Sequence, residues 1–82
     1  MTIKKPLVIN QPTIGKLIRE LRLLKGLTQE QFAVSLGVTY PTINRWENGR
    51  SKPSPLAMEK IEVQLIQIGD RGQDLIEKYL EN

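Results

Sequence analysis

The feature that most constrains the fold is a set of five restricted residue types spaced along one stretch of the chain: Ala33, Gly37, Val38, Ile43 and Trp46. The alanine is small where two helices would cross closely, and the glycine suits a left-handed turn that a Cβ disfavours. The valine would fill the angle between the helices. The isoleucine and the tryptophan are three residues apart, on one face of the second helix. This spacing predicts a helix-turn-helix over residues 29–48.

Helices are expected within this motif and on both sides of it, because apolar residues recur along the chain at helical spacing. The expected inward positions are Ile14, Leu17, Ile18, Leu21 and Leu24, then Phe32, Ala33 and Leu36, then Ile43 and Trp46, then Leu56, Ile61, Leu65 and Ile68, and finally Leu75, Ile76, Tyr79 and Leu80. Residues suited to an N-cap precede these patterns: Thr13, Thr28, Thr39, Ser54 and Asp70. Thr28 and Gln31 have the spacing of a capping box. The chain is therefore predicted to be all-α, with five helices.

The same patterns divide the chain into three segments. Residues 1–12 contain two prolines and no helical period, so we expect a short extended N-terminal arm. Residues 13–68 are predicted to form the domain that contains the helix-turn-helix. Residues 69–82 are predicted to form a C-terminal helix that closes the core. Part of its apolar surface could make a twofold contact between two copies, and the alternative is a core helix with no dimer.

Charge is distributed unevenly along the chain. Residues 1–52 contain nine basic and three acidic residues, a net charge of +6, whereas residues 53–82 contain three basic and six acidic residues, a net charge of −3. A basic front suggests an anionic partner for the first two-thirds of the chain, and the alternative is a solvated basic surface with nothing bound.

Composition excludes several kinds of chemistry. The chain has no His and no Cys, so it offers no imidazole base, thiol nucleophile, disulfide or zinc site of the usual ligands. We expect neither an enzyme nor a cofactor nor a metal site. No apolar run approaches the ~18 residues of a membrane span, and the three apolar residues 7–9 are too few for a secretory signal. The expectation is a cytoplasmic protein that does not bind membranes and has no separate ligand-sensing domain.

The chain resembles a known family in several short stretches: residues 26–33 (GLTQEQFA), 36–38 (LGV), 46–50 (WENGR) and 53–54 (PS), together with Ile43. It is similar to the phage-repressor or Cro-like helix-turn-helix proteins, also called xenobiotic-response-element-type regulators. The resemblance covers about residues 13–68. It implies a compact five-helix repressor-like domain that binds double-stranded DNA sequence-specifically, usually as a dimer on a palindromic operator, in a bacterium or a phage.

The second helix of such a motif enters the major groove with its N-terminal residues facing the bases. With Ile43 and Trp46 pointing into the core, we expect Tyr40, Asn44 and Arg45 to be exposed. Arg45 could pair with guanine O6 and N7, and Asn44 with adenine N6 and N7. Tyr40 could contact a thymine methyl group or a phosphate. Pro41 matches a base-reading position of the family but departs from its pattern, because proline has no polar side chain.

Other polar residues are expected to bind phosphates, which position the protein without specifying sequence. These residues are Gln29, Thr39, Thr42, Asn48, Arg50 and Lys52. The resemblance places Gln29 against the DNA backbone at the start of the first motif helix, where the helix dipole favours an anion. Arg22 and Glu47 match family positions that form a partly buried structural ion pair.

Two other functions remain open. Residues 56–82 could hold a protein partner, such as a toxin or a polymerase, in an antitoxin-type regulator or a DNA-binding subunit. The chain could also be a helical interaction module with no nucleic-acid role. That alternative leaves the tyrosine, asparagine and arginine of the second motif helix, beside a basic loop, without an explanation.

Overall fold

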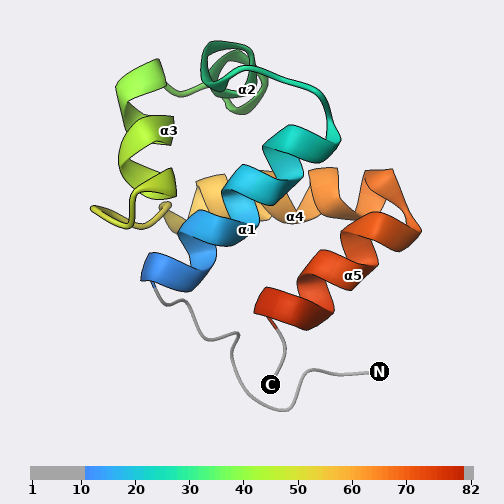
Figure 1. Ribbon diagram of the computed structural model, residues 1–82. Coiled ribbons are helices and arrows are strands. Elements are labelled where there is room, and N and C mark those ends of the chain that lie inside the picture. Colours follow the sequence, from blue (N-terminus) through green and yellow to red (C-terminus); the bar gives the residue numbers. More distant parts are fainter. Residues whose placement is uncertain (1–10, 81–82) are drawn as a thin grey trace.

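The computed structural model describes residues 11–80. These residues form five α-helices and no strand: α1 (Gln11–Leu24), α2 (Gln29–Leu36), α3 (Tyr40–Glu47), α4 (Pro55–Ile68) and α5 (Asp70–Tyr79) (Figure 1). The predicted all-α, five-helix fold is confirmed. None of the helices in the described part of the chain has the length and apolar character that crossing a membrane requires.

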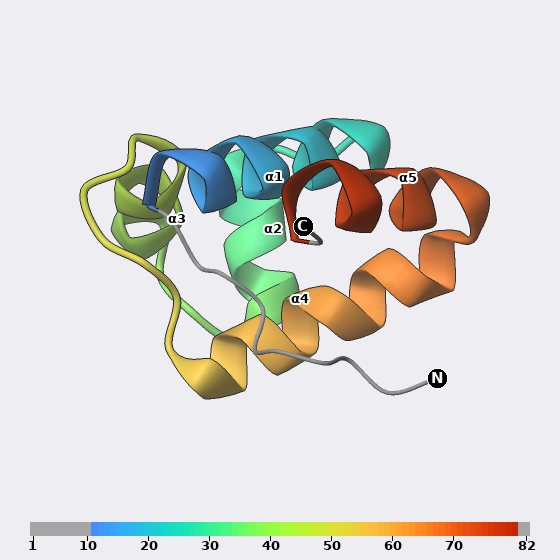
Figure 2. The ribbon, with the colours of Figure 1, turned by 90° about the horizontal axis from the view of Figure 1, so that it is seen from below.

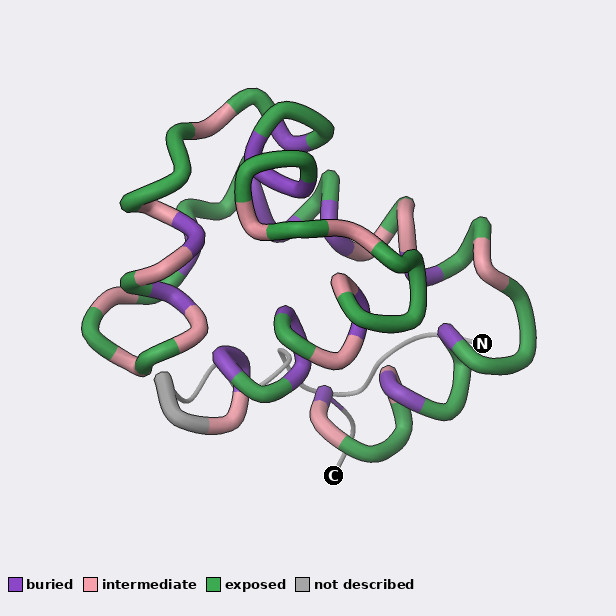
Figure 3. The backbone as a smooth tube through the Cα atoms, turned by 45° about the horizontal axis from the view of Figure 1, so that its top comes forward, coloured by how far each residue is buried: buried purple, intermediate pink, exposed green. Residues whose placement is uncertain are grey.

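α1 occupies the centre of the fold. It packs against α3 on one side and α5 on the other, while α2 contacts α3 and α4. Figure 2 shows α1 and α5 side by side with α4 opposite them. Buried positions turn inward from all five helices (Figure 3). They make up one core: Ile14, Leu17, Ile18, Leu21, Phe32, Ala33, Leu36, Ile43, Trp46, Ala57, Met58, Ile61, Leu65, Leu75 and Leu80.

Local sequence signals account for the ends of the middle helices. The Thr28 hydroxyl accepts a hydrogen bond from the backbone N–H of Gln31, and the Gln31 side chain accepts one from the backbone N–H of Thr28, which confirms the capping box. Gly37 ends α2 in the left-handed conformation at φ 71°. The Ser54 hydroxyl accepts from the Ala57 N–H at the start of α4. These caps fix the lengths of α2 and α4.

Two predicted helix starts are wrong. α1 begins at Gln11, so the predicted arm is two residues too long and Thr13 lies inside the first turn instead of capping it. The proline at position 12 falls in that first turn, where its missing N–H has no partner to lose. Before α5, Gly69 occupies the N-cap and Asp70 is the first helical residue. Gly69 has φ 88° and ψ −132°, a conformation that favours glycine over aspartate. Residues 1–10 of the predicted arm lie outside the described residues.

Two leucines expected in the core are exposed, Leu24 by 39% and Leu56 by 62%. Leu24 is the last residue of α1, beyond the part of the helix that is covered by its neighbours. The buried stripe of α4 runs instead through Ala57, Met58, Ile61 and Leu65. Leu56 therefore lies on the outward face of α4.

Two glycines allow helices to approach each other closely. A Cβ on Gly15 would lie 2.5 Å from the backbone carbonyl oxygen of Trp46, where α1 meets the end of α3. A Cβ on Gly72 would lie 1.7 Å from the carbonyl oxygen of Leu65, where α5 meets α4. Both distances are far shorter than van der Waals contact, so these two crossings require glycine.

A polar cluster joins α5 to α1. The Tyr79 hydroxyl donates a hydrogen bond to Glu20, and Lys78 lies 3.5 Å from the same carboxylate. The Lys78 Nζ also lies 5.1 Å from the centre of the Tyr79 ring. The bond to Glu20 raises the pKa of Tyr79 above its ordinary 10.0, because it stabilises the protonated hydroxyl. The neighbouring Tyr79 hydroxyl, as a hydrogen-bond acceptor, and then the negative charge of Glu20 raise the pKa of Lys78, because both stabilise its charged form.

Candidate nucleic-acid interface

α3 is anchored by one face and exposed on the other. Ile43 is fully buried and Trp46 is 4% exposed, which places both in the core as predicted. Tyr40 is 47% exposed at the start of the helix, and Pro41 and Arg45 are also exposed. The outward face of α3 therefore combines an aromatic, an apolar and a cationic side chain.

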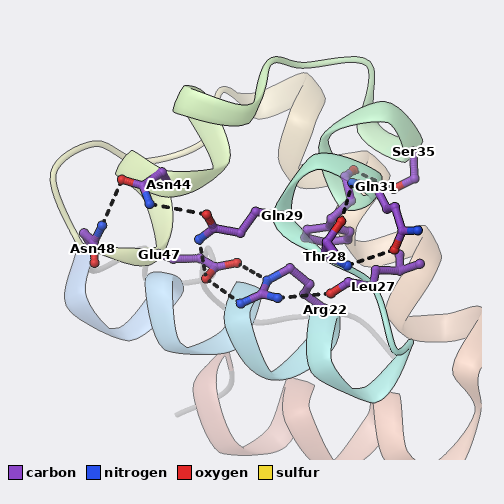
Figure 4. Close-up of polar contacts among 10 residues, drawn as sticks. Arg22, Leu27, Thr28, Gln29, Gln31, Ser35, Asn44, Glu47 and Asn48 are labelled. Atoms are coloured by element: carbon purple, nitrogen blue, oxygen red, sulfur yellow. Dashed lines mark hydrogen bonds and ion pairs between the residues drawn. The ribbon is translucent and has the colours of Figure 1, made fainter.

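The end of α3 is held by the ion pair between Arg22 and Glu47 (Figure 4). Arg22 Nε donates to Glu47 Oε2 at 2.7 Å, and its Nη2 donates to Oε1 at 3.1 Å. The third nitrogen, Nη1, donates to the carbonyl oxygen of Leu27 at 3.0 Å. Both side chains are largely buried, at 14% and 5% exposure. This two-pronged contact ties α1, the turn before α2 and α3 into one unit.

A chain of side-chain amides extends from this ion pair toward the surface. Gln29 Nε2 donates to Glu47 Oε1 at 3.0 Å, and Asn44 Nδ2 donates to Gln29 Oε1 at 3.3 Å. Asn48 Nδ2 in turn donates to Asn44 Oδ1 at 3.1 Å. The expectation that Asn44 is exposed is wrong: it is half-buried, and both ends of its amide are hydrogen-bonded. Gln29 belongs to α2, so the residue pattern within α3 could not reveal it as a partner, whereas Asn48 lies four residues after Asn44 at the end of α3.

The start of α3 has a second polar cluster. The Thr39 and Thr42 hydroxyls lie 2.9 Å apart, and Arg45 Nη2 donates to the Thr42 hydroxyl at 3.3 Å. Thr39 occupies the N-cap by position, but its side chain makes no capping hydrogen bond. The hydroxyl of Thr42 thus helps to orient the Arg45 guanidinium along the outward face of the helix.

A basic loop follows α3 directly. Gly49 turns the chain at φ 74°, and the backbone N–H of Arg50 donates to the Arg45 carbonyl oxygen at 2.9 Å. Arg50 and Lys52 are exposed, while Pro53 is buried and anchors the loop to the fold. The structure therefore brings the exposed cations of the loop next to the end of α3. Among residues 11–80, no group of three or more acidic side chains is placed to hold a metal ion.

The chain is similar both to a protein family and to individual proteins. Residues 18–65 match a family model described as helix-turn-helix. The chain is 34% identical over 65 residues to a candidate multi-protein-binding factor 1 of Yarrowia lipolytica. It is 32% identical over 66 residues to an uncharacterised helix-turn-helix-type transcriptional regulator of Archaeoglobus fulgidus. It is 49% identical over 45 residues to another such regulator, from Methanothermobacter thermautotrophicus.

These matches cover most of this chain but only part of each relative. The aligned regions are 79%, 79% and 55% of this chain, in the order given above. They span 42%, 29% and 65% of the respective relatives. The match to the family model covers more than half of the chain and includes α2, the turn and α3 in full. The chain therefore belongs to the helix-turn-helix family of the xenobiotic-response-element type.

Proposed function

We propose that this protein is a sequence-specific DNA-binding transcription regulator that inserts α3 into the major groove of double-stranded DNA. The observation that carries this proposal is the outward face of α3, where Tyr40, Pro41 and Arg45 are exposed beside a basic loop. An α-helix fits the width of the major groove. Two of the relatives are named as transcriptional regulators, which supports the same function.

Base reading is assigned to the exposed residues of α3. Arg45 is exposed and can present two N–H groups to guanine O6 and N7. Tyr40 and Pro41 offer apolar surface to a thymine methyl group, and Tyr40 also offers a hydroxyl. The reading of adenine by Asn44 stays a prediction. Its hydrogen bonds to Gln29 and Asn48 favour a different role.

Phosphate binding is assigned to polar groups at the edges of the motif. Gln29 is the first residue of α2, where free backbone N–H groups favour an anion. The other proposed phosphate ligands are Thr39, Thr42, Asn48, Arg50 and Lys52. Arg50 and Lys52 would supply most of the salt-dependent affinity, because each can displace counterions from the duplex.

The regulator would act as a repressor by occupying an operator, in the cytoplasm of a bacterium or a phage-infected cell. One helix-turn-helix reads roughly half a helical turn of DNA, so two copies on a palindrome gain affinity and specificity together. We assign the contact between copies to residues 69–82. Within that segment, Ile76 and Tyr79 are only partly buried against the core.

A second candidate function adds a protein partner, a toxin or a polymerase, held by residues 56–82. The favouring observation is a set of exposed apolar side chains on α4, with Leu56, Val63 and Ile66 exposed by 62%, 51% and 69%. One relative is named for binding several proteins. Purification from the source organism tests this candidate: a stoichiometric co-eluting protein would support it, and the chain eluting alone would contradict it.

Selection of bound sites from a random duplex library tests the main proposal. We expect one enriched motif, with a guanine at the position contacted by Arg45. A palindromic motif would support the dimer, and a single half-site would contradict it. A library that emerges without enrichment would reject sequence-specific binding.

A further inference from the structure

Three side-chain amides form a directed chain of hydrogen bonds that ends on a buried carboxylate (Figure 4). Asn48 donates to Asn44, Asn44 donates to Gln29, and Gln29 donates to Glu47. The carboxylate at the end of this chain is fixed by the Arg22 guanidinium. Every bond runs in the same sense, from an amide nitrogen to the oxygen of the next group.

The ion pair dictates this sense. A carboxylate paired with a guanidinium accepts hydrogen bonds and donates none, so Gln29 must turn its nitrogen toward Glu47. Its oxygen then faces Asn44, which must also present nitrogen, and the same requirement passes on to Asn48. Each amide nitrogen carries two N–H groups, and each bond in the chain uses one of them.

The second N–H group of each amide can donate a hydrogen bond to a DNA phosphate. Phosphate oxygens of DNA accept hydrogen bonds, so a side-chain amide binds a phosphate only when its nitrogen faces the DNA backbone. An amide without neighbours presents its oxygen or its nitrogen, and fixing one orientation costs conformational entropy on binding. The hydrogen-bond chain removes that cost before DNA arrives, because Glu47 and Asn44 hold the two ends of the Gln29 amide and Asn44 holds the amide of Asn48.

We propose that Asn44 is a positioning residue, which orients the amides of Gln29 and Asn48 toward DNA phosphates and reads no base. The inference rests on the proposed DNA-binding function. Pairing with adenine would require both the Nδ2 and the Oδ1 of Asn44, and each already has a partner within the protein. Adenine would therefore have to share the Asn44 amide with the two hydrogen bonds that hold the phosphate ligands, using its second N–H group and its second lone pair.

A double-mutant cycle on DNA affinity tests the proposal. The variants are Asn44→Ala, Gln29→Ala and the double substitution, titrated at fixed salt against the selected duplex and all its single-base-pair variants. We expect Asn44→Ala to weaken binding to every duplex by the same factor, about fivefold, and to leave the ranking of base pairs unchanged. The double variant should bind almost as Gln29→Ala does, because Asn44 acts largely through that residue.

Other outcomes overturn the proposal. Loss of preference at one base pair in Asn44→Ala would make Asn44 a base reader. Additive effects in the cycle, or wild-type affinity in Asn44→Ala, would show that it does not act through Gln29. A wild-type chain with no preferred duplex would instead reject the proposed function, and this inference with it. Should Asn44→Ala lower the melting temperature, Asn44→Leu provides the same test, since it keeps the side-chain size and adds no charge but has no donor for Gln29 and no acceptor for Asn48.

Discussion

Arg22 and Glu47 show how single residues position α3. The pair is largely buried, so its attraction is offset by the cost of removing both charges from water. Its value lies in geometry, because the paired hydrogen bonds fix the end of α3 relative to α1. Removing one partner would leave the other charge buried without compensation.

Glu47→Ala should therefore lower the free energy of unfolding by about 3 kcal/mol, since it strands the Arg22 guanidinium. Urea denaturation measures this loss. Glu30→Ala, at an exposed position in the first turn of α2, is the matched control and should change stability by less than about 1 kcal/mol. The double variant Arg22→Met with Glu47→Leu should recover most of the stability. A single variant as stable as wild type would contradict the structural role of the pair.

Gly15→Ala should also destabilise the fold, although alanine is normally the better helix former. The new methyl group would lie 2.5 Å from the carbonyl oxygen of Trp46, so α1 and α3 would have to separate. We expect a loss of about 1–3 kcal/mol in the free energy of unfolding. Lys16→Ala, at the exposed neighbouring position, is the control and should stay within about 0.5 kcal/mol of wild type. A gain in stability for Gly15→Ala would show that the crossing is looser than described.

At the scale of helices, local sequence signals identified all five elements. The capping box at Thr28, the left-handed Gly37 and the serine cap at Ser54 act within one turn, so the sequence alone reveals them. The start of α1 and the cap of α5 were missed. Thr13 and Asp70 have side chains suited to capping, but the helices begin at other positions.

The exposed faces depend on neighbours that are distant in the sequence. Helical periodicity predicted that Ile43 and Trp46 are buried and that Arg45 is exposed. It could not predict the partners of Asn44, one of which comes from α2. Nor did it indicate why Gly15 lies inside the amphipathic helix α1, although a glycine within a helical pattern is itself a signal of close packing.

The contact between α1 and α5 should weaken at high pH. The pKa of Tyr79 is raised in the folded state, so the folded protein holds the tyrosine proton more tightly than the unfolded chain does. This contribution is present below pH 10, the ordinary pKa, and is lost as pH rises through the raised pKa. The raised pKa of Lys78 acts in the same direction, from its ordinary value of 10.5 upward.

Tyr79→Phe should accordingly lower the free energy of unfolding by about 1 kcal/mol at neutral pH, through loss of the hydrogen bond to Glu20. The substitution should also make the free energy of unfolding decline less steeply above pH 10 than it does in wild type. Urea titrations at intervals of about one pH unit, from pH 8 to pH 11, measure both effects. Tyr40→Phe, which removes the hydroxyl of an exposed tyrosine on α3, should leave the free energy of unfolding unchanged at neutral pH. If the free energy of unfolding falls equally with pH in wild type and in Tyr79→Phe, the loss of stability at high pH does not come from Tyr79.

At the scale of the whole molecule, charge separates into two regions. The net charge is +6 over residues 1–52, which contain the helix-turn-helix and the start of the basic loop, and −3 over residues 53–82, which contain α4 and α5. If α3 enters DNA as proposed, we expect this charge distribution to favour an approach with α3 and its basic loop in front. The acidic region would then face away from the duplex.

Arg50→Ala and Lys52→Ala should each weaken binding to all duplexes alike. Each removes one phosphate contact, so the slope of log affinity against log salt concentration should become shallower by about 0.9. Arg71→Ala removes the same charge from an exposed position on α5 and is the control. Equal slopes for Arg50→Ala, Lys52→Ala and Arg71→Ala would show that the loop does not meet the backbone.

Whether α3 reads DNA sequence is tested directly by the affinity ratio between the selected duplex and a scrambled duplex, measured at one salt concentration for wild type and for Arg45→Ala. Sequence-specific reading by α3 predicts a wild-type ratio of ~10³ or more. In Arg45→Ala, this ratio should fall by the factor that corresponds to about 1–3 kcal/mol, the discrimination supplied by one bidentate base contact. Equal wild-type affinity for both duplexes would contradict the account.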